Sequence, residues 1–409
     1  MIRDTLRLLR VNRSYRLLWM AQAVSLCGDW FTLIALAVLV SGGSGGSGLA
    51  VGGLALAQLL PMVVVGPWSG VLADRFDRRR LLVASDLARS ALVLLLIPAA
   101  ASGRLSWIYA LAFLHFTVST VFEPTRSALV PRLVETRELV TATTVATVTW
   151  SVMAAAGGVV GGTVLSLAGV AGAFVLDALT FLGSAALIAA IPAAAAAARP
   201  AGADQVEEGR FRDGLAYVAR HRATGAALLV KGINGVAVAE VFLVIYATRR
   251  FPLGEGGAQS VGLLWACFGL GAILGPVLLN AANDGSVRRM RRLIVAGSAF
   301  LSGSLFALAA APSLAVAGLA IVLRGMGGAA NWTYSTIILQ KSVPDRFLGR
   351  LFALDLANAF LLAIVFSLLW GAMMDRVGLR PAVFAAATVS LLPLAAWTLG
   401  LRWMDRTEA

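Results

Sequence analysis

The residues of this chain that could do chemistry are single ionisable side chains set inside long apolar runs. Asp29 lies deep in the first run, and Gln22, Ser25 and Thr32 share its helix face because the spacing follows steps of three and four. An ionisable group at membrane depth is costly and usually faces a cavity. The pattern predicts a proton or cation site at Asp29; the alternative is a carboxylate held by helix-end groups near the outer boundary.

A second polar stripe lies in the fourth apolar run, where His115, Ser119, Glu123 and Arg126 fall on one side of a helix. Glu123 could exchange a proton, or it could be a static partner of Arg126, and the sequence leaves both open. His115 taken alone is typical of a hydrogen-bonded packing histidine.

The later runs carry a further polar face, on which Arg324 is joined by Asn331 and Ser335. This cation could pair with a substrate anion or a membrane carboxylate, or its long side chain could reach the membrane surface. The predicted proton and substrate cavity as a whole comprises Asp29, Gln22, Ser25, His115, Glu123, Arg126, Glu240, Arg324, Asn331 and Asp355.

Other charges inside the apolar runs have plainer interpretations or none. Asp86 and Arg89 are three residues apart and are predicted to form a structural pair. Lys231 and Glu240 are nine residues apart, about 180° around a helix, so we do not expect them to pair directly. Asp177 is a further intramembrane charge.

The composition excludes an ordinary soluble domain. The 409 residues are 59% hydrophobic and 13% charged, whereas soluble domains carry about 25% charged residues. The net charge of +13 comes from residues in the turns between apolar runs, which indicates membrane topology rather than nucleic-acid binding. Cys27, Cys267 and the two histidines show no metal-ligand spacing, and no nucleophile–base set or phosphate-binding motif is present. We therefore expect no enzyme activity, no cofactor and no metal.

Twelve apolar runs are long enough to span a membrane, and backbone polarity requires each to be helical in lipid. They predict the fold class: an all-α membrane protein with two pseudo-symmetric six-helix bundles. The glycine–serine segment 41–48 is expected to be flexible coil. The runs cover roughly residues 15–40, 49–73, 80–101, 105–130, 139–168, 170–193, 223–248, 258–282, 293–311, 313–341, 348–374 and 380–401.

Lysine and arginine residues are distributed unevenly between the two sides. Most lie on the side of the amino terminus, where several arginines precede the first run. By the positive-inside rule, both termini are predicted to be cytoplasmic. The opposite side is expected to hold Arg104, Arg249, Arg250, Arg376 and Arg380.

The segment 194–222 divides the chain into two halves. We predict an N-terminal six-helix bundle over 1–193, a cytoplasmic linker with a short surface helix over 194–222, and a C-terminal six-helix bundle over 223–409. An internal repeat supports this division, because duplicated halves are a common transporter plan. Residues 70–79 align on 280–289 at an offset of 210, and Gly162 and Gly169 align on Gly371 and Gly378 at an offset of 209.

The motif that identifies a family follows the second run, where residues 70–79 read Gly-Val-Leu-Ala-Asp-Arg-Phe-Asp-Arg-Arg. The chain resembles the major facilitator superfamily over essentially its whole length, although Asp77 stands where the family pattern often has glycine. Three further stretches, at 12–29, 122–131 and 343–350, look like the branch that holds macrolide, siderophore and multidrug exporters.

The resemblance implies roles for two groups of residues. Asp74 would face the start of the eleventh span near 345–350 and hold the outward-facing state, while Gly70 would let helices approach closely. The alternative is a positive topology anchor. The implied gating residues are Gly70, Asp74, Arg75, Arg78, Arg79 and Gly349.

The fifth run carries a glycine pattern similar to the antiporter motif of drug–proton exchangers. It departs from that motif at Gly158, where proline is usual, and plain helix packing is the alternative. The glycines concerned are Gly157, Gly158, Gly161 and Gly162.

These features together predict a secondary transporter in the bacterial plasma (inner) membrane. The preferred function is proton-coupled efflux (antiport) of amphipathic organic compounds such as drugs, by alternating access. The expected partners are a small-molecule substrate, protons and the lipid bilayer, with no nucleic acid, and the protein is expected to be a monomer. A dedicated exporter of one metabolite, such as a siderophore or lysolipid, and a non-transporting membrane scaffold or sensor are the alternatives.

Overall fold

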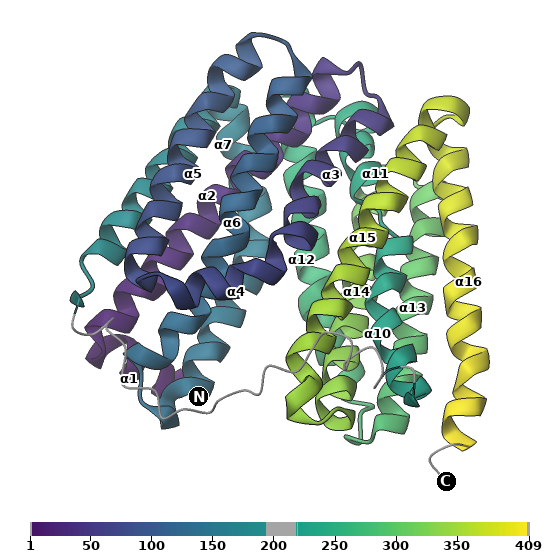
Figure 1. The fold of residues 1–409 in the computed structure, drawn as a ribbon. Helices are drawn as coiled ribbons and strands as arrows, with labels where there is room; N and C mark the ends of the chain where they lie inside the picture. The colour runs from purple at the N-terminus through teal and green to yellow at the C-terminus, as the bar shows by residue number, and fades with distance from the viewer. Residues whose placement is uncertain (1, 194–217, 219, 407–409) are drawn as a thin grey trace. The chain divides into compact units, whose positions relative to one another are not determined.

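The computed structural model describes residues 2–193, 218 and 220–406, and these residues form helices joined by short turns (Figure 1). The first helices along the chain are α1 (Ile2–Val11), α2 (Arg13–Gly43), α3 (Gly48–Val64), α4 (Gly66–Arg75), α5 (Arg78–Ala101), α6 (Leu105–Leu133), η1 (Thr136–Glu138) and α7 (Leu139–Ala189). The later ones are α10 (Arg222–Val236), α11 (Glu240–Ile245), the π-helix η2 (Tyr246–Arg250), η3 (Glu255–Gly257), α12 (Ala258–Asn280), α13 (Val287–Ala310), α14 (Leu314–Ser342), α15 (Asp345–Val377) and α16 (Leu379–Arg406).

The number of membrane spans follows from where long helices break. Among the described residues, ten helices are long and apolar enough to cross a membrane, and the number is eleven if α3 and α4, which are bent by 53° at their junction, count as one broken span. A continuous α7 of 51 residues would extend about 76 Å, far beyond a hydrocarbon core of about 30 Å. It breaks at Gly169, whose φ of 68° and ψ of −179° suit only glycine, and so supplies two spans. The predicted all-α membrane fold is confirmed.

A second glycine of the predicted repeat has the same role. Gly378 lies between α15 and α16 with φ 89° and ψ 168°, close to the values at Gly169. Both junctions therefore join two spans through a single residue in a conformation that a side chain would strain. The repeat therefore aligns two glycines, Gly169 and Gly378, that have nearly the same backbone conformation.

The chain forms two compact units. The first unit comprises Met1–Gly45, Ala57–Asp204 and Pro252–Ala266, and the second comprises Gly46–Leu56, Gln205–Phe251 and Cys267–Ala409. The start of α3 thus groups with the second unit and the start of α12 with the first, an exchange that the predicted division at 1–193 and 223–409 does not contain. The predicted linker 194–222 lies almost entirely outside the described residues.

Within the first unit, the exporter-like stretch at 12–29 anchors α2 to its neighbours. The side chain of Asn12 caps α2 by accepting from the backbone N–H of Tyr15 at 2.9 Å, and its amide donates to the carbonyl of Leu133 at 2.6 Å. The Tyr15 hydroxyl donates to the carbonyl of Ala142 at 2.9 Å, and Trp19 Nε1 donates to Thr149 Oγ1 at 2.9 Å. These bonds join α2 to α6 and α7 near the amino-terminal ends of α2 and α7.

The glycines of α7 pack the first half of this helix against two partners. A methyl group at Gly161 would lie 2.9 Å from the carbonyl oxygen of Trp30 on α2. One at Gly158 would lie 2.6 Å from that of Gly262 on α12, and one at Gly162 would lie 2.7 Å from that of Ala258. Since the obstacles are backbone atoms, these glycines permit close helix approach, which supports the packing alternative for the motif.

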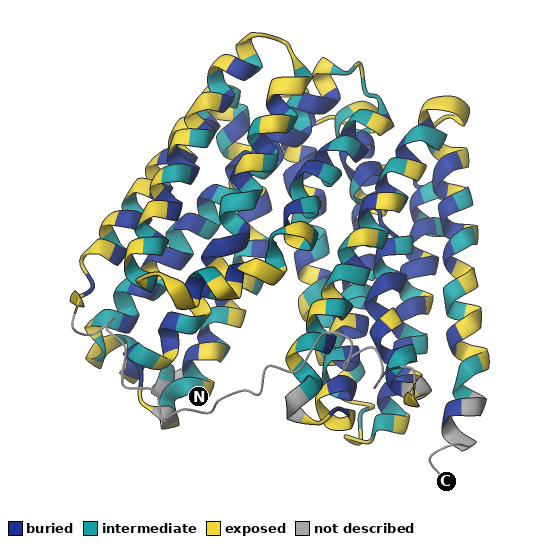
Figure 2. Cartoon of the chain, in the orientation of Figure 1, coloured by how far each residue is buried: buried dark blue, intermediate teal, exposed yellow. Residues whose placement is uncertain are grey.

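Helix α16 of the second unit shows how the apolar surface divides. Ala382, Val383 and Ala386 are buried against the unit, whereas Leu392 and Leu399 are 68% and 72% exposed. Figure 2 shows buried and exposed residues on opposite sides of this helix. Exposed leucines at this frequency are typical of a face that contacts lipid.

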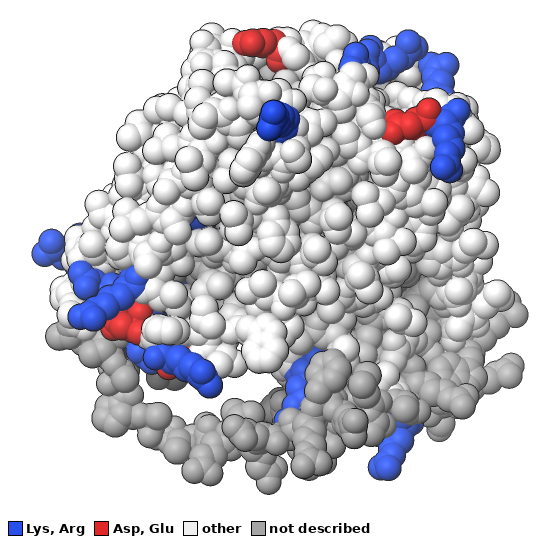
Figure 3. Space-filling view, turned by 45° about the horizontal axis from the view of Figure 1, so that its top comes forward, with Lys and Arg blue, Asp and Glu red and all other residues white. Residues whose placement is uncertain are grey.

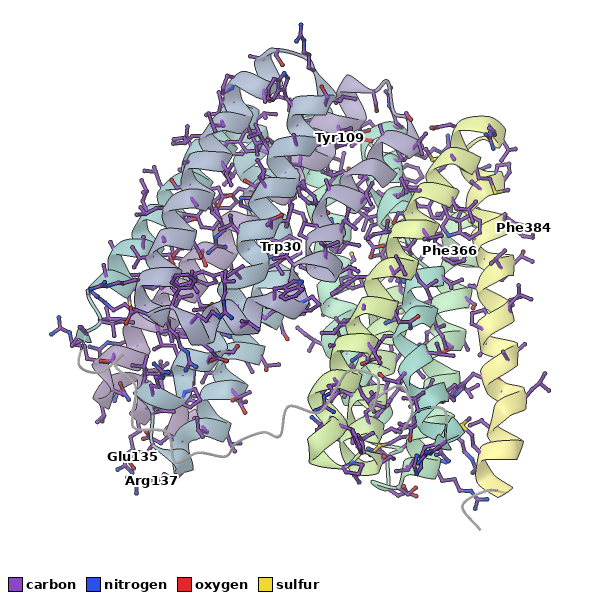
Figure 4. The ribbon with its side chains drawn as sticks, in the orientation of Figure 1. Trp30, Tyr109, Glu135, Arg137, Phe366 and Phe384 are labelled. Atoms are coloured by element: carbon purple, nitrogen blue, oxygen red, sulfur yellow. The ribbon has the colours of Figure 1, made fainter. Side chains whose placement is uncertain are left out.

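Charged side chains are confined mostly to the ends of the helices. On the face drawn in Figure 3, most charged side chains lie near its edges and the broad surface between them is uncharged. Figure 4 shows one such end, where Glu135 and Arg137 lie at the turn between α6 and α7 and form an ion pair of 2.7 Å. An uncharged band between charged helix ends is the surface that a bilayer requires.

The glycine–serine segment 41–48 is more ordered than expected. Residues 41–43 continue α2, and Ser44 ends the helix by donating its backbone N–H to the carbonyl of Val40 at 3.0 Å. Ser47 and Gly48 then begin α3. The expectation of coil is wrong for residues 41–43 and 48, which are helical, whereas residues 44–47 form the turn between the two helices.

Candidate functional site

The polar centre of the first unit is a group of four side chains from α2, α5 and α7, which we term the carboxylate cluster: Asp29, Asp86, Arg89 and Asp177. Asp86 and Arg89 on α5 form the predicted ion pair, and both are buried. Arg89 Nη1 also lies 3.9 Å from Asp29 Oδ1 on α2. The predicted structural pair and the predicted proton site are therefore one assembly.

The second oxygen of Asp86 is also satisfied. Asp86 Oδ2 accepts the hydroxyl of Ser184 on α7 at 2.6 Å. With the guanidinium of Arg89 on its other oxygen, this carboxylate has the paired environment that a buried charge needs.

Asp177 on α7 is fully buried and has hydroxyl partners. Its Oδ2 accepts from Thr32 on α2 at 2.5 Å, and its Oδ1 accepts from Thr180 at 3.2 Å. Gly28 makes this contact possible, because a methyl group there would collide with the side chains of Thr180 and Asp177. The cluster thus sets two carboxylates against one guanidinium and a third, Asp177, beside Asp29 at a point where α2 and α7 approach closely.

The guanidinium of Arg89 lies between two aromatic rings. Its central carbon is 4.2 Å from the ring centroid of Phe122 and 4.3 Å from that of Phe181. Cation–π contacts with two rings hold the guanidinium in place beside the carboxylates of Asp29 and Asp86.

His115 packs in the same aromatic surroundings. Its ring centroid lies 5.1 Å from that of Phe116 and 5.7 Å from that of Phe181, and the residue is 1% exposed. Its Nδ1 has no hydrogen-bond partner among the described residues. The structure therefore supports packing for His115, without a bond from that nitrogen.

The remaining predicted residues of the first unit lie apart from these contacts. Gln22 and Ser25 are buried on α2, where Ser25 Oγ donates to the carbonyl of Gln22 at 3.3 Å. Glu123 on α6 accepts from Arg126 at 2.9 and 2.5 Å, and its side chain is 59% exposed. Of the two interpretations of Glu123, the structure favours the partner of Arg126.

Among the described residues, the second unit contains two matched ion pairs, of which one is fully buried and the other is partly exposed at Glu240. Lys231 on α10 and Asp355 on α15 form an ion pair in which both side chains are buried. Lys231 Nζ also lies 4.6 Å from the ring centroid of Trp332 on α14. As expected, Lys231 does not pair with Glu240, which has another partner.

Arg324 on α14 is that partner, with its Nη2 3.2 Å from Glu240 Oε1. Glu240 follows the break between α10 and α11. About two turns along α14, the amide of Asn331 donates to Asn234 Oδ1 at 3.3 Å and to Ser298 Oγ at 3.1 Å. Of the interpretations of Arg324, the structure therefore favours pairing with a carboxylate inside the membrane over extension of the side chain to the membrane surface.

The predicted gating loop has a local structure of its own. Asp74 forms an ion pair of 2.7 Å with Arg78, and its side chain is 71% exposed. Arg78 also donates to the carbonyl of Ala128 at 2.7 Å, and Arg79 donates to that of Ile188 at 3.3 Å. The arginines thus fasten the start of α5 to α6 and α7. Asp74 and the start of the eleventh span belong to different units, so their contact stays a prediction.

The close approach expected at Gly70 is to a span of the other unit, so it stays a prediction. A methyl group at Gly70 or at Gly349 would meet no atom within 4 Å among the described residues. Arg75 is the last residue of α4, directly before the loop.

The aligned loop of the second unit is built in a similar way. Asp77 caps α5 by accepting from the N–H of Arg80 at 2.8 Å, and Ser286 caps α13 by accepting from that of Arg289 at 3.1 Å. Asp284 accepts from the N–H of Ser286 at 2.8 Å, and hydrogen bonds from Ser286 lower the pKa of Asp284 below its ordinary value.

Metal binding and small cavities do not coincide with the cluster. Among the described residues, no group of three or more His, Cys, Asp or Glu side chains could hold a metal ion. A cavity of about 340 Å³ in the second unit is lined by Tyr246, Arg250, Leu379 and Arg380, none of which belongs to the predicted site.

The sequence identified each of these charged residues, but it did not predict that Asp177, Asp86 and Arg89 lie close to Asp29. The available signal was an aspartate inside a strongly apolar run, which by default marks a functional position. Which helices face one another depends on their rotation, and Gly28, next to Asp29, is the sequence feature that could have indicated close contact there.

Comparison with known proteins places this architecture in a family. Residues 8–408 match the family described as transmembrane secretion effector. Macrolide efflux protein A of Streptococcus pyogenes is 24% identical over 382 residues, covering 89% of this chain and 90% of that protein. The uncharacterized MFS-type transporter YfiS of Bacillus subtilis is 26% identical over 363 residues, covering 84% and 83%.

Solved structures show the same fold at lower identity. A bacterial homologue of the human lysosomal transporter Spinster superposes with a TM-score of 0.74 at 14% identity, covering 96% of this chain and 97% of that one. The nucleoside transporter NupG superposes with a TM-score of 0.72 at 11% identity, covering 94% and 98%. A match along nearly the whole chain, on a fold of membrane-spanning helices, makes this protein a member of the transmembrane secretion effector family of major facilitator superfamily transporters.

Proposed function

We propose that the protein exports amphipathic organic compounds in exchange for protons, by alternating access, as a monomer with both termini in the cytoplasm. The observation that carries the proposal is the carboxylate cluster, in which Asp29 and Asp86 lie against the guanidinium of Arg89 and Asp177 is hydrogen-bonded to Thr32, one turn from Asp29. A buried carboxylate without its own cation is costly in a membrane protein. A cluster with more acid than base therefore has a physical reason to bind and release a proton.

Asp29 is the proposed exchange site because it is the accessible member of the cluster. Its side chain is 35% exposed, whereas that of Asp86 is fully buried and paired with Arg89. Asp177 is equally buried and is held by two threonine hydroxyls. A proton must arrive from water, so the exposed carboxylate receives it first, and the other two carboxylates set its electrostatic surroundings.

The substrate class rests on the relatives and on the apolar character of the chain. Macrolide efflux protein A, by its name, exports macrolides, which are large amphipathic molecules. Efflux assays in a host without its own drug pumps, with a panel of such compounds, test this class. Transport of one metabolite alone, such as a siderophore or lysolipid, would replace it with a dedicated exporter.

The proton coupling is tested in proteoliposomes with an imposed pH gradient. Asp29→Asn removes the titratable group without changing its volume, so we expect uphill efflux to fall at least about tenfold, within the range of coupling energies in proteins. Substrate counterflow, which needs no net proton movement, should persist and shows that the variant is folded.

Glu123→Gln is the matched control, because it makes the same chemical change in a carboxylate that is already paired with Arg126. Unchanged efflux in Asp29→Asn would remove Asp29 from the mechanism. Absence of counterflow in the unsubstituted protein would contradict transport of the tested compounds altogether.

A further inference from the structure

The first turn of α3 is capped by a carboxylate from a distant span. Asp375, in the last turn of α15, accepts the backbone N–H of Gly48 at 2.6 Å and that of Leu49 at 3.0 Å. It also accepts the hydroxyl of Ser47 at 2.7 Å. Both oxygens of one side chain are therefore used on the beginning of another helix.

The cap satisfies the start of α3 completely. The first N–H groups of a helix have no intrahelical partner, and here Asp375 takes the first two. Ser47 Oγ accepts the third, from Ala50 at 3.2 Å, and the carbonyl of Ser47 accepts the next, from Val51 at 3.2 Å. A negative charge at this position also favours the helix dipole. Separation of α3 from α15 would leave two backbone donors and one carboxylate to be hydrated.

Below the cap, the two helices touch through small residues at matched spacing. A methyl group at Gly48 would lie 2.8 Å from the carbonyl oxygen of Gly371, and one at Gly52 would lie 2.7 Å from that of Ser367. Ser367, Gly371 and Asp375 follow one another at steps of four on α15, as Gly48 and Gly52 do on α3. Small residues four apart on both helices permit backbone contact, and Asp375 ends this stripe at its polar edge.

We propose that this contact is a latch on the side of the membrane opposite the amino terminus, predicted to be the outer side, and that Asp375 is its positioning residue. The inference rests on alternating access as proposed above. The start of α3 groups with α15 in the second unit while the same helix continues into the first unit from Ala57, so in this proposal opening on this side detaches the start of α3 from α15. The carboxylate stabilises the closed arrangement through bonds that water can replace, and the bonds re-form when the stripe closes.

The latch is tested on the full chain in proteoliposomes, without reference to substrate. Cys27 and Cys267 are replaced by serine, and Ser367→Cys places one thiol in the stripe, where Ser367 is fully buried. A membrane-impermeant thiol reagent is added on the side opposite the amino terminus. We expect Asp375→Asn to raise the labelling rate about tenfold, the population change that loss of a helix cap can produce, and Asp375→Glu to raise it less.

A second variant reaches the same contact without altering charge. In Gly371→Ala the new methyl group meets the backbone of Gly48 and Leu49, so labelling should again accelerate. Gly42→Ala, where nothing lies within 4 Å, is the matched control for the glycine change. Asp284→Asn is the matched control for loss of an exposed loop carboxylate.

Hydrogen exchange separates the cap from the gate. In Asp375→Asn the backbone amides of Gly48 and Leu49 should exchange with solvent faster. The exchange is measured by mass spectrometry on a peptide spanning residues 44–54. Amide exchange could become faster while the thiol-labelling rate stays unchanged, in protein whose thiol labels fully when denatured. That result would overturn the latch and show that Asp375 only caps the helix locally. Unchanged rates in both Asp375→Asn and Gly371→Ala would overturn it as well. Failure of proton-driven efflux in the unsubstituted protein would instead contradict the proposed function and leave these rates interpretable.

Discussion

The two units bury charge in opposite ways. In the first, Asp29 and Asp86 lie against Arg89 and Asp177 is hydrogen-bonded to Thr32 on the same helix as Asp29, which leaves an excess of two carboxylates over cations in the cluster. In the second, Lys231 pairs with Asp355 and Arg324 pairs with Glu240, so each acid has its own base. An unbalanced group has a reason to exchange protons with its surroundings, whereas a balanced pair keeps its charge state and fixes helices in place.

The difference also appears in the partners that complete each group. Asp177 relies on the hydroxyls of Thr32 and Thr180, which can act as donors or acceptors. Those hydrogen bonds can therefore survive a change in the protonation of the carboxylate. Asp355 relies on an ammonium group, which only donates. The first arrangement tolerates titration, and the second opposes it.

The strongest way to break the comparison is to remove the cation of the cluster. Arg89→Met leaves three carboxylates without a base, and loss of one partner from a buried charge group costs about 3–5 kcal/mol. We expect a large drop in the thermal unfolding temperature in detergent. Adding Asp86→Asn should recover part of the loss, because it removes the carboxylate that depends most on Arg89. An Arg89→Met protein as stable as the unsubstituted one would show that the carboxylates are already neutral.

Substitutions in the balanced pair Lys231–Asp355 should lower the stability less than Arg89→Met does, and the loss should be recoverable by a second substitution. Asp355→Asn should destabilise the protein by about 3 kcal/mol, because it strands the buried ammonium of Lys231. The double variant Asp355→Asn, Lys231→Met removes both charges and should recover most of that loss. Thermal unfolding of the two single variants and the double variant measures the coupling. Additive losses would contradict a closed, balanced pair.

The smallest effect on stability is expected at Asp177. Asp177→Asn removes one of the excess carboxylates while keeping an acceptor for Thr32, so the unfolding free energy should change by less than about 1 kcal/mol. The contrast with Asp355→Asn, the same substitution in a balanced pair, is the point of the experiment. Equal destabilisation by the two variants would remove the distinction between the units.

Much of the fold could be predicted from hydropathy and glycine positions. The runs 139–168 and 170–193 placed a break at the residue where the backbone of α7 leaves the helix, and the repeat paired Gly169 with Gly378. The interruption of the seventh span between α10 and α11 was not predicted, because the segment Val236–Glu240 contains no proline and is largely apolar.

The candidate site was predictable only in part. Depth in an apolar run is readable from sequence, and it singled out Asp29. The distance from Asp29 to Arg89 depends on how α2 and α5 are rotated about their axes, which spacing along one helix does not determine. For the same reason the sequence did not predict the pairing of Lys231 with Asp355, which are 124 residues apart in the chain.

The single-residue junctions at Gly169 and Gly378 restrict how this protein can be altered. Neither junction can readily take an insertion, because a single glycine joins two long helices in a backbone conformation that other residues rarely adopt. Reporter tags, epitope insertions and new chain ends made by circular permutation should therefore fail at these two places. Engineering of this kind is better directed to junctions of several residues, such as the one between α12 and α13.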